Sequence, residues 1–204
     1  MINNLQIILP LLSFESKDDF YYLQILQRKK ENPELGSNSR VIKNYYISSV
    51  EYLTERYPEI IKLCEVFNAR ASIRLNKRSY KKVGMKAMVN LANTMMNEEY
   101  SFLKASYDRA CGLGHNDKNK TWIVDIDKDE VIWLEQIINS IQSSQPEGNK
   151  IVAQIPSKTG MHLITKPFNT LDFKDRFTEE LTEYKMSYVE LEIHKDNPTN
   201  LYIP

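Results

Sequence analysis

The sequence predicts an α+β fold built from two modules, residues 1–114 and residues 115–204. Three observations lead to this prediction. The chain has 204 residues, enough for one domain or for one domain with an appended lobe, and 42% of them are hydrophobic. Segments with alternating apolar residues are interspersed with segments whose apolar residues recur at helical spacing. The stretch "ACGLGHNDKNK" follows neither period and separates the two halves as a loop.

Charge and cysteine content narrow the class of protein. The 27 basic and 27 acidic residues cancel, whereas a general nucleic-acid coating protein is usually strongly basic. Cys64 and Cys111 are isolated, which argues against a disulfide framework or a CxxC zinc site and favours a reduced, cytoplasmic compartment. No apolar run approaches the roughly 20 residues of a bilayer span, so we expect no membrane association.

The first module is expected to begin with a strand in "MINNLQIILPLLSF", which lacks the basic region and cleavage site of a signal peptide. A helix is predicted over residues 18–32, followed by a loop and a strand at "VIKNYYI". Ser48 and Glu51 have the spacing of a capping box before the next helix. Pro58 suits the first turn of one further helix.

A basic strand and a long helix complete this module. In "RASIRLN" the alternation places Ala71 and Ile73 towards a core and Arg70 and Arg74 towards water or an anion. Residues 66–97 contain no acidic residue, which favours an anion-facing role for the two arginines. The alternative is a solvated helix face, which accounts well for Lys81, Lys82 and Lys86.

Ser79 is expected to cap the long helix that follows the basic strand. Its apolar residues keep a helical stripe that we interpret as core: Val83, Ala87, Met88, Leu91 and Met95.

The second module reads β-α-β-β-α-β. The predicted segments are a strand at 121–127, a helix at 130–143, strands at "KIVAQIP" and "MHLITK", a helix at "LDFKDRFTEEL" and a strand at "SYVELEIH", with "TNLYIP" as a last short strand. Phe173, Phe177 and Leu181 follow one helix face. This order is that of ferredoxin-like domains, and it alone says little about function.

Asp125 and Asp127 end the apolar run "TWIVDID". Because a strand turns successive side chains to opposite faces, the two carboxylates point to the same side. Two neighbouring anions repel each other unless a cation joins them or water separates them. The pair therefore indicates either a site for two Mg²⁺ ions, as in phosphoryl-transfer enzymes, or a solvated strand end.

A hairpin in "IPSKTGMHLI" carries the next candidate residues. Ser157, Lys158 and Gly160 form its tip, and His162 lies two residues beyond the glycine. A lysine, backbone amides and an imidazole at one place suit a triphosphate, while an ordinary solvated hairpin is the alternative.

The C-terminal segment offers a third acid. Asp196 lies in a turn, and Glu190 and Glu192 share a strand face with His194. Any of these residues could complete a metal site, although turn chemistry also accounts for Asp196. His115 is interpreted as a loop residue.

The order of these features resembles the archaeo-eukaryotic primase (primase-polymerase) family. The matching segments are the basic strand, "WIVDID", "SKTGMHLI" and "EIHKDN", over roughly residues 65–204. The first 64 residues match no motif of that family. The resemblance implies an RRM-like catalytic core beside an N-terminal α/β module.

The resemblance also implies a function, a template-dependent nucleotidyltransferase of DNA replication that adds an NTP or dNTP to a 3′-hydroxyl. Its site residues would be the following: catalytic Asp125, Asp127 and His162; Mg²⁺ or Mn²⁺ ligands Asp125, Asp127 and Asp196, with Glu192 as the alternative third acid; nucleotide contacts Ser157, Lys158, His162 and Arg74; and contacts to single-stranded or primed DNA from Arg70, Arg74, Lys77 and Arg78.

The chain departs from the family pattern because it has no zinc motif and no C-terminal helical priming domain. We therefore expect a helicase or an accessory priming domain on another chain as a partner. Two alternatives remain open. The same sheet suits a non-catalytic nucleic-acid or nucleotide-binding module, which zero net charge favours. Paired carboxylates on a strand equally suit a metal-dependent nuclease.

Overall fold

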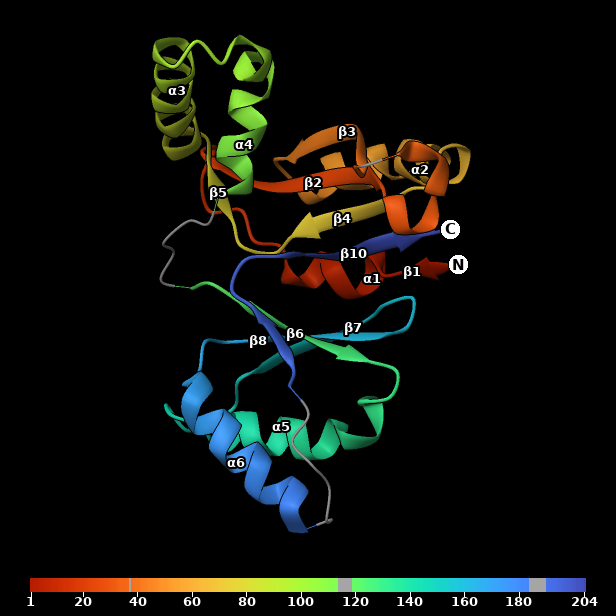
Figure 1. The fold of residues 1–204 in the computed structure, drawn as a ribbon, viewed down its shortest axis with the longest axis vertical. Helices are drawn as coiled ribbons and strands as arrows, with labels where there is room; N and C mark the ends of the chain where they lie inside the picture. The colour runs from red at the N-terminus through yellow and green to blue at the C-terminus, as the bar shows by residue number, and fades with distance from the viewer. Residues whose placement is uncertain (37, 114–118, 184–189) are drawn as a thin grey trace. The chain divides into compact units, whose positions relative to one another are not determined.

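The computed structural model describes residues 1–36, 38–113, 119–183 and 190–204 (Figure 1). The chain forms two compact units, one from Met1–Lys118 with Asn200–Pro204 and one from Asn119–Thr199. The described residues form helices and two antiparallel sheets, which confirms the predicted α+β class. In this described part, no helix has both the length and the apolar composition that a bilayer span needs.

The sheet of the first unit has the strand order β1-β10-β4-β2-β3, and β5 also pairs with β2. The strands are β1 (Ile2–Asn3), β2 (Asp19–Gln27), β3 (Arg40–Ile47), β4 (Arg70–Arg74), β5 (Arg78–Ser79) and β10 (Pro198–Ile203). The helices are α1 (Leu5–Ile8), α2 (Val50–Val66), α3 (Tyr80–Met96) and α4 (Ser106–Gly112). The last strand of the chain thus pairs with the first, Ile203 lying opposite Ile2.

A strand, β2, replaces the helix predicted over residues 18–32, so this prediction is wrong. β2 lies between β3 and β4, and Phe20, Tyr22 and Leu23 are all buried. Because side chains on both faces of β2 are covered, its apolar run is continuous and shows no strand alternation. Such a run cannot be told from a buried helix by its period alone.

The N-terminal segment and α2 also differ from the prediction. Only Ile2–Asn3 is a strand, and α1 and a 3-10 turn occupy residues 5–11 of the predicted strand. α2 begins after Ser49, whose hydroxyl accepts a hydrogen bond from the backbone N–H of Tyr52 at 3.0 Å. Pro58 lies inside α2 rather than starting a second helix, because one buried stripe continues past it.

α3 and α4 contact one side of this sheet through a buried cluster that contains Phe20, Tyr22, Val83 and Cys111. As predicted, Ser79 caps α3, accepting a hydrogen bond from the backbone N–H of Lys82. The predicted core stripe of α3 is wrong beyond its first turns: Val83 is buried, but Met88, Leu91 and Met95 are exposed. Helical spacing shows which residues share a face but not what that face contacts.

Two tyrosines and an aspartate join α4 to the sheet. The hydroxyls of Tyr22 and Tyr46 donate to the same carboxylate oxygen of Asp108, at 3.2 and 2.6 Å. Burial and the Asp108 carboxylate raise the pKa of both tyrosines well above its usual value. Burial also raises the pKa of Tyr57 and Tyr107 to about 12.

These tyrosines predict a loss of stability at alkaline pH. Their folded pKa values lie above the unfolded value of about 10, so the unfolded chain releases protons first. The stability that they contribute is complete below about pH 10 and declines as the pH rises through the folded values. Urea unfolding at a series of pH values, with tyrosinate absorbance recorded in parallel, checks this. A free energy of unfolding that stays constant above pH 10 contradicts it.

The sheet of the second unit has the strand order β7-β8-β6-β9 (Figure 1). The strands are β6 (Trp122–Asp127), β7 (Ile151–Pro156), β8 (Gly160–Thr165) and β9 (Glu192–His194), and the helices are α5 (Leu134–Ser143) and α6 (Thr170–Glu183). Both helices cover one face, where Val124 and Leu163 meet Ile141 and Phe177 in a buried core. Since side chains alternate along β6, Asp125 and Asp127 lie on the other face.

Candidate functional site

The register of the second sheet brings acidic and imidazole side chains together on the face opposite α5 and α6. Asp125 of β6 lies directly opposite His162 of β8 on one side and Glu192 of β9 on the other. His194 lies opposite Ile123, two residues before Asp125. Because directly opposed residues of an antiparallel pair share a face, Asp125, His162, Glu192 and His194 point the same way.

Three of these residues, Asp125, Glu192 and His194, lie close enough together to hold a metal ion. One ligand atom from each of Asp125, Glu192 and His194 lies within 4.8 Å of the others. The Nε2 atom of His194 is 3.1 Å from a carboxylate oxygen of Glu192. The side chains of Asp125 and His194 are 39% and 30% exposed, so solvent and ions can reach them. Two carboxylates and an imidazole form a donor set that binds divalent cations.

His162 is held between two partners. Its Nδ1 atom lies 2.8 Å from the hydroxyl of the buried Thr199, and its Nε2 atom lies 3.6 Å from a carboxylate oxygen of Asp125. These contacts fix the imidazole ring of His162 beside Asp125, Glu192 and His194, which we call the metal-type group. Thr199 was not foreseen from the sequence, because nothing local links it to a histidine so far away in the chain.

Glu130 adds a further carboxylate that the sequence analysis missed. It accepts a hydrogen bond from the backbone N–H of Asp127 at 2.8 Å. Burial raises the pKa of Glu130, and the negative charges of Asp127, Asp125 and Glu192 raise it further. A bound cation would lower this mutual repulsion. The spacing of Glu130 three residues after a strand-ending aspartate is the signal that could have identified it.

The predicted third acid can be compared directly with its alternative. Among the described residues, the metal-type group contains Glu192 but neither Asp127 nor Asp196. Asp127 is exposed at the end of β6, on the same face as Asp125. Asp196 is partly buried in the turn between β9 and β10. Proximity to Asp125 therefore favours Glu192 as the third acid.

The hairpin between β7 and β8 places its tip beside the end of β6. The backbone N–H of Ser157 donates to the carbonyl of Gly160 at 2.9 Å, and Lys158 is exposed at the tip. Gly160 lies opposite Asp127. A Cβ atom at Gly160 would lie 1.9 Å from the carbonyl oxygen of Ile126, so only glycine lets β8 approach β6 this closely.

This close approach predicts opposite effects for two glycine substitutions. Gly160→Ala is expected to destabilise the fold by about 3 kcal/mol, because backbone atoms of β6 must move. Gly84→Ala is the matched control: it lies in α3, nothing would come within 4 Å of its Cβ, and alanine should stabilise the helix by about 1 kcal/mol. Chemical unfolding measures both. Equal effects of the two substitutions contradict the close approach at Gly160.

The predicted nucleic-acid contacts all lie in the first unit, and their role stays a prediction. Arg70 is largely buried and forms an ion pair with Glu31, its Nε donating at 2.9 Å. Lys77 pairs with Glu15 and Asp19.

Arg78 is 1% exposed and donates to the backbone carbonyls of Cys111 and Asn76. Arg74 is partly buried at the end of β4. Arg70, Lys77 and Arg78 thus all have intramolecular partners. His115, interpreted as a loop residue, lies outside the described residues.

Comparisons with protein-family models, with curated protein sequences and with solved structures found no significant match.

Proposed function

We propose that this protein is a template-dependent nucleotidyltransferase of the primase-polymerase type. One observation carries the proposal: Asp125 lies between His162 and Glu192 on a single sheet face, and His194 joins them. Nucleotidyl transfer needs divalent cations to neutralise phosphate charge, and an imidazole beside such a site could contact the phosphates. Had the Asp125 and His162 side chains pointed to opposite faces, this function would have had no basis.

The architecture of the second unit is compatible with the proposed RRM-like core. α5 connects β6 to β7, α6 connects β8 to β9, and β6 and β8 are the central strands. Ferredoxin-like and RRM-like sheets have this split βαβ connectivity. Fold alone does not imply catalysis, so the proposal depends on the side chains of the exposed face.

The donor set fits Mg²⁺ or Mn²⁺ and favours Mn²⁺. Asp125, Glu192 and His194 would hold the ion. Carboxylates suit both metals, whereas an imidazole ligand suits the softer Mn²⁺ better than Mg²⁺. When bound, the ion would neutralise phosphate charge and lower the pKa of the attacking hydroxyl.

The other residues would bind and orient the reactants. The 3′-hydroxyl oxygen forms a bond to the α-phosphorus of an NTP or dNTP, the bond from that phosphorus to the bridging oxygen breaks, pyrophosphate leaves, and the hydroxyl proton passes to solvent. Lys158 and the hydroxyl of Ser157 would hold the triphosphate from the hairpin tip, with His162 beside it. The role of Arg74, a residue of the first unit, as a template or nucleotide contact stays a prediction. Positioning and charge stabilisation would supply most of the rate.

A primed-template assay with Mg²⁺ or Mn²⁺ tests the proposal and its alternatives together. Elongation of a labelled primer, greater with Mn²⁺, is the expected result. Shortening of the strand would identify a nuclease instead. Retention of the strand with no change in its length, in the presence of either metal, would leave only a binding module.

A further inference from the structure

The C-terminal two thirds of α3 expose an apolar stripe. Met85, Met88, Val89, Leu91, Met95 and Met96 all face solvent, with exposed fractions from 43% for Leu91 to 81% for Met96. They recur at the i, i+3, i+4 spacing that in other helices faces a core. Val83 and Thr94, on the opposite side of α3, are the buried ones. Exposed apolar stripes of this kind mark interaction surfaces, and methionines adapt readily to a partner.

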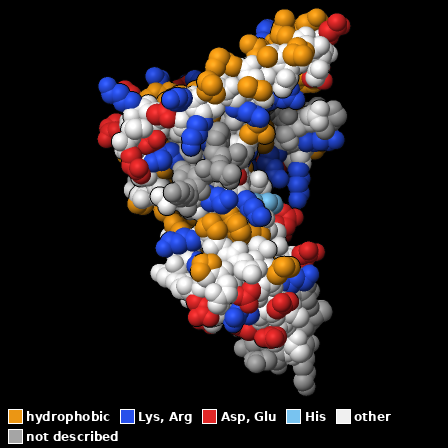
Figure 2. All heavy atoms as spheres, turned by 90° about the vertical axis from the view of Figure 1, so that its left-hand side faces the viewer, with side chains coloured by type: hydrophobic (Ala, Val, Ile, Leu, Met, Phe, Trp, Pro, Cys, Tyr) orange, Lys and Arg blue, Asp and Glu red, His pale blue; other side chains and the backbone are white. Residues whose placement is uncertain are grey.

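The two ends of this stripe carry opposite charge. Lys81, Lys82 and Lys86 lie at the start of α3, and Glu98 and Glu99 follow its end, all exposed. Figure 2 shows hydrophobic side chains gathered over this part of the molecule, with acidic side chains at the top and basic ones below. This polarity opposes the helix dipole, which favours acids at the start and bases at the end. These charged side chains therefore do not stabilise α3 through its dipole.

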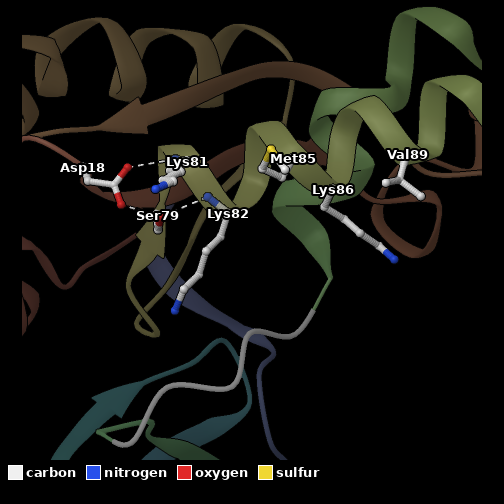
Figure 3. Close-up of a pocket in the computed structure, with 7 residues that line it drawn as sticks. All are labelled: Asp18, Ser79, Lys81, Lys82, Met85, Lys86 and Val89. Atoms are coloured by element: carbon white, nitrogen blue, oxygen red, sulfur yellow. Dashed lines mark hydrogen bonds between the residues drawn. The ribbon is translucent and has the colours of Figure 1, made fainter.

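Hydrogen bonds to Asp18 hold the basic start of α3 in place, while its lysines remain exposed. The Asp18 carboxylate accepts hydrogen bonds from the Ser79 hydroxyl and the backbone N–H of Lys81, and these bonds lower the pKa of Asp18 (Figure 3). A shallow hollow of about 600 Å³ lies along this end of the helix. Met85 and Val89 line it, and the side chains of Lys82 and Lys86 reach outwards. It can receive an apolar side chain from outside.

We propose that α3 is a dimer interface and that its partner is α3 of a second copy of this chain, running antiparallel. A two-fold axis that crosses the apolar stripe at the level of Asn90 along α3 places Lys81 and Lys82 of one copy beside Glu99 and Glu98 of the other. The same axis sets Met85 near the second copy's Met95, whose side chain would enter the hollow. An interface between identical chains must be self-complementary in this way. A parallel pairing would set lysines against lysines.

Paired charge reversals test the arrangement. Lys81→Glu/Lys82→Glu and Glu98→Lys/Glu99→Lys should each dissociate the dimer, because each variant sets like charges against each other. Each also improves the match to the helix dipole, so neither should unfold the protein. An equimolar mixture of the two variants should associate again, which analytical ultracentrifugation would show as twice the monomer mass. Association of each variant alone, or none in the mixture, overturns the proposed pairing.

A second pair of variants tests the apolar stripe. Met88→Glu should weaken the dimer at least about tenfold, equivalent to a shift of one decade in the dissociation constant. Leu171→Glu is the control, because Leu171 is also exposed, at 74% against 59% for Met88, but lies on α6. The wild-type chain remaining a monomer at all concentrations refutes the inference. In that event, binding to phosphatidylserine vesicles would identify the stripe as a contact to an anionic membrane surface. Absence of such binding would indicate a different protein as the partner of the stripe.

Discussion

Asp125→Asn is expected to lower divalent-dependent nucleotide incorporation at least about a hundredfold, which corresponds to roughly 2.7 kcal/mol or more of transition-state stabilisation. Asparagine keeps the size of the side chain and removes the charge that lies between His162 and Glu192. The measurement is primer extension with Mn²⁺ at saturating nucleotide. Asp129→Asn is the matched control, because Asp129 is an exposed acid in the turn after β6 and outside the metal-type group.

The same substitution has a readout that does not depend on catalysis. Mn²⁺ at a hundredfold excess over its dissociation constant should raise the wild-type free energy of unfolding by about 2.7 kcal/mol. Asp125→Asn should abolish this gain. An unchanged response of both activity and thermal stability to Mn²⁺ in the variant removes Asp125 from the site.

Two further variants decide which residue supplies the third acid. Glu192→Gln is expected to weaken Mn²⁺ binding by an order of magnitude, because Glu192 lies with Asp125 and His194. Asp196→Asn should leave it nearly unchanged. The reverse result would restore Asp196, the first choice from the sequence, and would remove Glu192.

Arg78→Met is expected to destabilise the protein by about 3 to 5 kcal/mol. The Arg78 guanidinium is buried and donates to the carbonyls of Cys111, at 3.0 Å, and of Asn76, at 2.7 Å. Methionine fills part of the volume but leaves these acceptors without that donor. Lys77→Ala, one residue earlier, should cost about 1 kcal/mol or less, since one of its acidic partners, Glu15, is largely exposed.

This pair of variants also tests the predicted DNA contact at Arg78. Chemical unfolding and binding of single-stranded DNA are measured on the same preparations. A variant that keeps its stability within about 1 kcal/mol of the wild type but loses DNA affinity assigns Arg78 to nucleic acid. A large loss of stability shows instead that Arg78 stabilises the folded protein.

Local sequence patterns predicted much of the second unit. The alternation that ends in Asp125 and Asp127 is β6, and the stripe of Phe173, Phe177 and Leu181 is buried on α6. Glycine at position 160 was assigned to a hairpin tip, and a turn closes there. Each of these features is decided by residues within a few positions of one another, where period and turn chemistry are sufficient.

Long-range contacts explain where the same patterns misled. β2 was mistaken for a helix because the side chains on both of its faces are buried, so its apolar run shows no alternation. The stripe of α3 was assigned to the core, but its methionines face solvent. Arg70 was assigned to a face that meets water or an anion, and its guanidinium pairs with the carboxylate of Glu31, 39 positions away. In each case the apolar or charged character of the segment was recognised, but the local pattern could not show which distant part of the chain, or solvent, it contacts.

The sequence by itself determined the α+β class, the strand that carries Asp125 and Asp127, and the hairpin that carries His162. Only the tertiary structure decided that Glu192 and His194 stand beside Asp125, that Glu130 and Thr199 surround the group, and that the stripe of α3 points outwards. The physical reason is the distance along the chain over which each feature is determined. The direction of a side chain follows from the local backbone period, whereas the group it meets depends on strand register and helix packing between distant segments.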